Sequence, residues 1–205
     1  MRNSAPPLPV LAYGVAGRPM PGQTESGDGY IVLPCADGTL LGVIDGLGHG
    51  PLAATATRLA RAVLHDHVDG DDLVAAVQAC APRLLTTRGV VMTLAFLSNA
   101  SPMMTWLGVG NVEGVVMHAS PSSNSTRVVL RGGVVGGTLP SLHSSTIALA
   151  DGDLLILATD GVQSRFAANV NRSGEPAQVA QDILNKFGKN SDDALVLVAR
   201  WNGAP

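Results

Sequence analysis

Short apolar runs separated by turn residues predict most of the strands of this chain. The runs Tyr30–Pro34 and Thr39–Ile44 enclose an Asp-Gly turn, which is a strong signal for a β-hairpin. Because paired antiparallel strands run in opposite directions, this hairpin places Asp28, before the first strand, beside Asp45, after the second. Further strands are expected at residues 10–16, 89–97, 103–109, 112–118, 127–130, 153–159 and 194–199.

Three amphipathic stretches predict helices between these strands. Apolar residues recur at helical spacing over residues 52–63, 73–84 and 177–187, and Gly188 is placed to end the last of them. We expect the strands between residues 89 and 130 to form an antiparallel meander, and Asp151-Gly152 to form a hairpin turn. Two packed sheets with helices outside would bury every apolar face. The expected fold class is therefore α+β, a single-domain antiparallel β-sandwich of two sheets flanked by α-helices on both outer faces.

Composition limits the domain count and the class of partner. The 205 residues suffice for one core, so residues 1–205 are expected to form one domain, with a core of about 10–201 and a flexible segment 1–9. A formal charge of -3 without a basic run argues against a nucleic-acid partner. Cys35 and Cys80 are expected to be buried thiols. Without an apolar span of membrane length, we expect a cytoplasmic protein with no membrane partner.

Aspartates follow or precede several of the expected strands. Asp160-Gly161 repeats the pattern of Asp45-Gly46, in which an apolar strand stops at Asp-Gly, and Asp192-Asp193 precedes the last strand. Ligands that are all oxygen suit Mg²⁺ or Mn²⁺ rather than zinc. Carboxylates gathered around one point repel one another unless cations lie between them. An ordinary glycine turn with an acidic residue is the alternative for each motif by itself.

Taken in order, these motifs resemble those of the PPM metal-dependent protein phosphatases. The resemblance spans roughly residues 10–200, and within the family the chain is most similar to the small RsbX-type stressosome phosphatases and less similar to the SpoIIE group. The matching motifs are Ser26-Gly27-Asp28, Asp45-Gly46-Leu47-Gly48 with Leu52-Ala53, Arg88-Gly89, Val109-Gly110-Asn111-Val112, Thr159-Asp160-Gly161 and Asp192-Asp193-Ala194-Leu195.

The resemblance implies a centre of two divalent cations, Mn²⁺ or Mg²⁺, at one edge of a sandwich. Asp45 would bridge the two metals and the nucleophilic water, and Gly46 would offer its backbone carbonyl to one metal. Asp160 and Asp192 would hold the second metal, and Asp28 would act through metal-bound water. Asp193 matches a neighbouring position of the terminal motif rather than a direct ligand.

The implied activity is that of a protein serine/threonine phosphatase. A hydroxide activated between the two metals would hydrolyse phosphoserine or phosphothreonine. The resemblance points to RsbS- and RsbR-like stressosome proteins with STAS domains as substrates, and to a monomeric enzyme. Two alternatives stay open: a phosphatase of a phosphorylated anti-anti-sigma factor outside the stressosome, and a catalytically weak phosphoprotein-binding module.

Other polar residues near these motifs have less defined roles. Arg18 and Arg88 are candidates for substrate phosphate binding, with a solvated loop arginine and a structural arginine as the respective alternatives. Glu25 does not adjoin Asp28 as the acidic pair does in larger relatives. We expect His49 to open the following helix as a bystander, and Asn111 to serve a tight turn.

Overall fold

Two β-sheets pack face to face in the computed structural model, which describes residues 11–67, 70–120 and 123–203. The first sheet has the order β1-β11-β10-β6-β7, and the second has the order β2-β3-β4-β5-β8, with β9 also paired to β5. Neighbouring strands are antiparallel except β5 and β8. The strands are β1 (Leu11–Arg18), β2 (Asp28–Pro34), β3 (Gly38–Gly46), β4 (Val90–Ser98), β5 (Met103–Val109), β6 (Glu113–Met117), β7 (Thr126–Arg127), β8 (Leu130–Arg131), β9 (Ser145–Ala148), β10 (Leu154–Ala158) and β11 (Ala194–Trp201).

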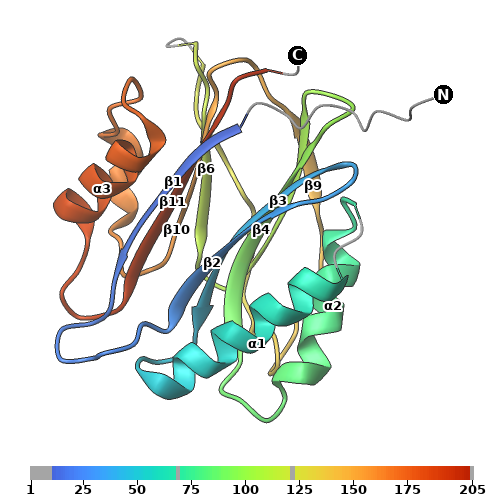
Figure 1. Ribbon diagram of the computed structural model, residues 1–205, viewed down its shortest axis with the longest axis vertical. Helices are drawn as coiled ribbons and strands as arrows, with labels where there is room; N and C mark the ends of the chain where they lie inside the picture. Colours follow the sequence, from blue (N-terminus) through green and yellow to red (C-terminus); the bar gives the residue numbers. More distant parts are fainter. Residues whose placement is uncertain (1–10, 68–69, 121–122, 204–205) are drawn as a thin grey trace.

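Helices cover the outer face of each sheet, as Figure 1 shows. The helices α1 (Pro51–His67) and α2 (Leu73–Leu84) pack on the second sheet, and α3 (Pro176–Phe187) packs on the first. A short 3₁₀ helix, η1 (Ser164–Ala168), lies beside α3. Three apolar clusters fill the spaces between the four layers. The predicted α+β sandwich with helices on both faces is therefore confirmed.

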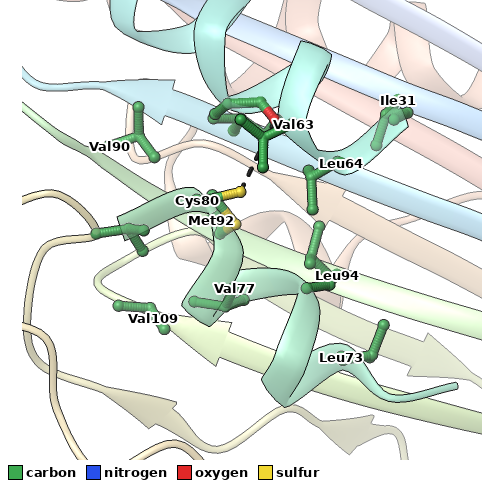
Figure 2. Packing of buried hydrophobic residues seen from close by; sticks show 14 of the residues in the cluster. Ile31, Val63, Leu64, Leu73, Val77, Cys80, Val90, Met92, Leu94 and Val109 are labelled. Atoms are coloured by element: carbon green, nitrogen blue, oxygen red, sulfur yellow. Dashed lines mark hydrogen bonds between the residues drawn. The ribbon is translucent and has the colours of Figure 1, made fainter. Parts of the chain in front are cut away.

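The helices form because each buries one apolar stripe. In α1, Ala56, Ala60 and Val63 are buried against the second sheet at helical spacing. Figure 2 shows Cys80 of α2 within this cluster, where its thiol donates to the Ala60 carbonyl at 3.8 Å. Burial raises the pKa of Cys80 to about 12, so this thiol stays protonated. Cys35 is only half-buried, which corrects the prediction that both thiols are enclosed.

The hairpin β2–β3 brings two of the predicted site residues together. Its register pairs Asp28 directly with Asp45, as expected. The predicted turn does not explain why residue 38 is a glycine, because the backbone φ of Gly38 is not positive. A Cβ on Gly38 would lie 2.2 Å from the Leu97 carbonyl oxygen of β4. Close approach of the next strand, rather than turn conformation, therefore accounts for the glycine.

The expected meander is wrong in one respect, because the chain changes sheets after β5. Gly110, with φ of 88°, turns the chain out of the second sheet and β6 then joins the first. The predicted strand 127–130 is likewise two short strands, β7 and β8, in different sheets. Asp151-Gly152 joins β9 to β10 across the two sheets, so it is not a hairpin turn. Buried strands of both sheets are uniformly apolar, so the pattern could not assign them to one sheet.

Several boundaries differ only slightly from expectation. The first strand continues to Arg18, while the predicted start at Val10 lies outside the described residues. Pro82 is accommodated in the last turn of α2, and the Gly188 N–H donates to the Leu184 carbonyl at the end of α3. None of the helices in the described ranges has the length and apolar character needed to span a membrane.

Candidate metal centre

Four aspartates lie at one end of the sandwich because neighbouring strands end there. Asp28 opens β2 and Asp45 lies at the end of β3. In the other sheet, Asp160 follows β10 and Asp192 precedes its antiparallel neighbour β11. The strand pairs thus deliver two carboxylates from each sheet to the same edge.

Gly161 shows why a glycine follows Asp160. A Cβ at this position would lie 1.8 Å from the Asp193 carbonyl oxygen and would collide with the chain entering β11. The missing side chain lets the turn after β10 pack against the segment that carries Asp192. The Asp-Gly pattern is therefore a packing requirement of the site.

A threonine ties the two sheets together at this edge. The Thr159 hydroxyl donates to Asp28 Oδ2 at 2.8 Å, and the Leu195 N–H donates to the same hydroxyl at 2.9 Å. Thr159 therefore holds the Asp28 carboxylate of the second sheet against the first sheet. Its role was not predicted from the sequence, although it stands inside the Thr159-Asp160-Gly161 motif.

Asp193 has a supporting position beside the other four aspartates. Its side chain is buried, with 3% of its surface exposed, and accepts hydrogen bonds from the backbone N–H groups of Met20 (2.6 Å) and Gly27 (2.7 Å). These bonds hold the loop that leads into Asp28. Both carboxylate oxygens of Asp193 therefore already accept a hydrogen bond, and that Asp193 is not a metal ligand stays a prediction.

Burial and electrostatic repulsion distinguish Asp28, Asp45 and Asp160 from ordinary surface acids. Burial, followed by the nearby Asp45, raises the pKa of Asp28 to about 8. Burial, with Asp160 and Asp192, raises the pKa of Asp45 to about 7. The pKa of Asp160 is also raised, by burial and then by Asp192, while Lys189 acts in the opposite direction. The negative charge of the cluster is therefore not fully compensated by nearby positive groups.

The donor set fits hard divalent cations that keep part of their water shell. All four side chains offer oxygen, the donor that Mg²⁺ and Mn²⁺ prefer. Within the described ranges, no group of three or more His, Cys, Asp or Glu side chains is arranged to hold a metal ion by itself. The aspartates thus form an open set, which backbone carbonyl and water oxygens would have to complete.

A cavity of about 430 Å³ opens beside these carboxylates. It is lined by Asp45, Asp160 and Asp192, and also by His49 and Asn111. The Asn111 amide donates to Asp160 Oδ2 at 2.8 Å, so Asn111 orients a carboxylate in addition to following the turn at Gly110. His49 precedes α1 and faces the cavity, although we expected a bystander that opens the helix.

The two arginines predicted to contact phosphate have different surroundings. Arg18 Nη2 donates to the Lys189 carbonyl (3.0 Å) and to Asn190 Oδ1 (2.9 Å), so Arg18 holds the loop before Asp192. Arg88 is exposed, and its guanidinium packs against Gly48 at the cavity, where a Cβ would lie 2.5 Å from Nη1. Of the two, Arg88 is therefore the one with an exposed guanidinium near the cavity.

Glu25 lies in an exposed ion pair outside the aspartate cluster. Its carboxylate accepts from Arg58 Nη1 at 2.9 Å, and both side chains are about half exposed. This placement agrees with the expectation that Glu25 does not adjoin Asp28 as an acidic pair.

Comparison with known proteins places most of the chain in one family. The sequence model of Stage II sporulation protein E (SpoIIE) matches residues 36–202. Phosphoserine phosphatase RsbX of Bacillus subtilis (strain 168) is 21% identical over 177 residues, which cover 86% of this chain and 87% of RsbX.

Solved structures agree over nearly the whole length. A structure from work on the bacterial stressosome, a modular system adapted to control secondary messenger signaling, has a TM-score of 0.84 and 28% identity, covering 93% of this chain and 99% of that chain. RsbX in complex with magnesium has a TM-score of 0.81 and 20% identity, covering 93% and 94% of the two chains. The catalytic domain of the phosphatase PstP with two manganese ions has a TM-score of 0.70 and 20% identity, covering 93% and 97%.

The family model covers the chain from just before β3 to the end of β11, and the solved structures also cover most of the part that precedes it. Because the model covers most of the chain, this protein belongs to the SpoIIE family and has the fold of the PPM phosphatases.

Proposed function

We propose that this chain is a metal-dependent protein serine/threonine phosphatase of the RsbX kind whose substrates are phosphorylated RsbS- and RsbR-like stressosome proteins. The observation that carries the proposal is the meeting of Asp28, Asp45, Asp160 and Asp192 at one edge of the sandwich, where burial and the neighbouring carboxylates raise the pKa of Asp28, Asp45 and Asp160. Such a concentration of negative charge is stabilised by divalent cations and disfavours a purely structural role.

The roles follow from the position of each side chain. Asp45 lies between Asp28, its partner in β2, and the pair Asp160 and Asp192, so it is the residue that would bridge two cations. The Gly46 carbonyl would add one oxygen, and Asp160 and Asp192 would hold the second cation. When bound, two Mn²⁺ or Mg²⁺ ions would activate water and stabilise the oxygens of an in-line displacement at phosphorus.

The surrounding residues would keep this arrangement rigid. Thr159 restrains the Asp28 carboxylate and Asn111 restrains the Asp160 carboxylate, each through a hydrogen bond of 2.8 Å. Arg88 at the cavity would contact the phosphate of the substrate, because an exposed guanidinium can bind phosphate with two hydrogen bonds. Arg18 would act indirectly, by holding the loop that carries Asp192.

The choice of substrate is supported by the relatives. RsbX is named a phosphoserine phosphatase, and the related structure with 28% identity comes from work on the stressosome. A phosphorylated anti-anti-sigma factor is the other substrate class to test, since it has the same phosphoester chemistry. We expect the enzyme to act as a monomer.

The direct test is phosphate release from purified phosphoproteins. RsbS- and RsbR-like STAS proteins and an anti-anti-sigma factor, each phosphorylated on serine or threonine, are incubated with the chain, with Mn²⁺ or with a chelator. We expect metal-dependent release, fastest from the stressosome proteins. If phosphate were released from the anti-anti-sigma factor alone, that protein and not the stressosome proteins would be the substrate. Binding without release from any phosphoprotein would indicate a binding module.

A further inference from the structure

A groove of about 500 Å³ runs along the outer edge of β2, on the opposite side of that strand from β3. Its walls come from Tyr13 of β1, from β2 itself and from Arg58, Arg61 and His65 of α1. None of the lining residues is acidic. In Figure 1, α1 runs beside β2 and β3.

The edge of β2 has main-chain groups directed into this space. Gly27 O accepts from Gly46 N, and Cys35 N donates to Gly38 O, so the odd-numbered residues pair with β3. In an antiparallel strand, successive residues direct their N–H and C=O groups to opposite sides. Tyr30 and Val32 therefore direct theirs away from β3, where the described sheet ends.

The side chains of the groove have the character of a binding surface. The chain contains only two tyrosines, Tyr13 and Tyr30, and both lie here with 50% and 37% of their surface exposed. The Arg61 guanidinium lies 5.8 Å from the centre of the Tyr30 ring. Exposed tyrosine and arginine are the residue types that contribute most to protein recognition.

The charge of the groove is only partly neutralised. Arg58 pairs with Glu25, and His65 lies 3.4 Å from Asp66. Arg61 has no carboxylate within ion-pair distance among the described residues, and its stem lies against Gly29 of β2. A ligand with carboxylates would supply the missing negative charge.

The groove begins close to the aspartate cluster. Tyr30 is two residues from Asp28 and Leu33 is five, so this part of β2 extends from about 7 to about 17 Å beyond Asp28, at about 3.3 Å per residue. An extended chain with its phosphoserine at the cluster would reach the groove roughly three to six residues from the phosphorylated position.

We propose that this groove docks an acidic, extended segment of the phosphoprotein substrate, which pairs with the open edge of β2 and places its carboxylates against Arg61 and Arg58. The inference rests on the proposed phosphatase function and deepens it, because it names what the enzyme recognises besides the phosphate. Strand addition to an open edge supplies affinity through main-chain hydrogen bonds, and the charged side chains select the sequence.

The test compares two synthetic phosphoserine peptides of equal length. One carries Asp or Glu three to six residues from the phosphoserine on both sides, and the other carries Asn or Gln there. We expect kcat/KM for the acidic peptide to be about five-fold or more above that for the neutral one at low salt, and this preference to shrink at high salt. Equal rates for the two peptides would overturn the docking proposal.

Variants separate docking from catalysis. Arg61→Glu should abolish the preference for the acidic peptide while leaving hydrolysis of p-nitrophenyl phosphate, which is too small to reach the groove, unchanged. The matched control is Arg83→Glu, the same charge change at an exposed position of α2, which should keep the preference. Val32→Pro removes one edge N–H and should weaken hydrolysis of the acidic peptide but not of p-nitrophenyl phosphate.

Two further outcomes would contradict the proposed function or the docking proposal. Loss of metal-dependent hydrolysis for every substrate, including p-nitrophenyl phosphate with the unaltered chain, would contradict the proposed function itself. A concentration-dependent dimer that Arg61→Glu abolishes, measured by sedimentation, would assign the groove to a second copy of the chain and would overturn the peptide docking.

Discussion

An aspartate lies at each end of β10, Asp153 before the strand and Asp160 after it. Hydrogen-bond donors surround the first, whereas other carboxylates lie near the second. Asp153, just before the strand, has 1% of its surface exposed and accepts hydrogen bonds from the backbone N–H groups of Ala119 (2.8 Å) and Ala150 (3.0 Å). His118 Nδ1 lies 2.9 Å from its second oxygen atom. Asp160, just after the strand, has one side-chain donor, Asn111, and faces the carboxylates of Asp45 and Asp192.

This contrast distinguishes a structural carboxylate from a functional one. At Asp153, donors from neighbouring segments compensate the cost of burial, so the charge stabilises the fold. At Asp160, the neighbouring carboxylate of Asp192 raises the cost of the charge, Lys189 and Asn111 offset part of it, and a bound cation would offset more. The same residue type at the two ends of one strand therefore serves folding at one end and, in our proposal, metal binding at the other.

The largest expected effect is loss of activity at the functional end. Asp45→Asn removes the charge that would bridge two cations, so turnover should fall by more than the 10- to 100-fold typical of residues that only support metal ligands. The fold should persist, because the change removes repulsion. Phosphate release and thermal unfolding, measured on one preparation, check both statements. A well-folded Asp45→Asn protein with full activity would refute the site.

The aspartate cluster should also make the metal-free protein sensitive to pH. The pKa values of Asp28 and Asp45 are about 8 and about 7 in the folded chain, against 3.8 ordinarily. Between these limits the folded state binds more protons than the unfolded state, so the free energy of unfolding falls as pH rises. We expect a loss on the order of a few kcal/mol from about pH 4 to about pH 8.

Urea denaturation in the presence of a chelator, repeated across this pH range, measures that loss. Mn²⁺ or Mg²⁺ should flatten the curve, because the cations replace the protons. Stability that rose steadily from pH 4 to pH 8 without metal would contradict the described electrostatics.

The matched change at the other end of β10 should affect stability and leave catalysis intact. Asp153→Asn keeps the size of the side chain but replaces one acceptor oxygen with a donor, so a buried N–H is left without a partner. We expect a loss of about 1–3 kcal/mol in the free energy of unfolding. Activity per folded molecule should be unchanged. If Asp153→Asn lowered kcat without lowering stability, the distinction between the two ends would not hold.

A smaller effect is expected when the orientation of Asp160 is disturbed. Asn111→Ala removes its hydrogen bond to Asp160 Oδ2 and should lower activity about ten-fold. The loss should be partly recovered at higher Mn²⁺ concentration, because the ligand is misplaced rather than missing. Titration of activity with Mn²⁺ for both proteins checks this, and an unchanged metal requirement would show that Asn111 serves only the turn.

Local pattern predicted the residues of the site better than their connections. The hairpin placed Asp28 beside Asp45, because an antiparallel pair with a short loop has only one register that buries the apolar residues of β3. The role of these two and of Asp160 and Asp192 as metal ligands stays a prediction. The support given by Thr159 and Asp193 could not be predicted. Each contacts residues more than a hundred positions away in the sequence, and no periodicity reports such contacts.

By itself, the sequence determined the long strands and the three α-helices, though not the short strands β7, β8 and β9, and it determined that Asp28 lies beside Asp45. These depend on interactions between neighbours in the chain, which apolar spacing and turn residues encode directly. Only the tertiary structure decided that the chain leaves the second sheet at Gly110, and that Thr159 joins Asp28 to the first sheet. The central strands β3 and β4 of one sheet and β10 and β11 of the other bury both faces and are similarly apolar, so only packing of the complete sandwich assigns each one its place.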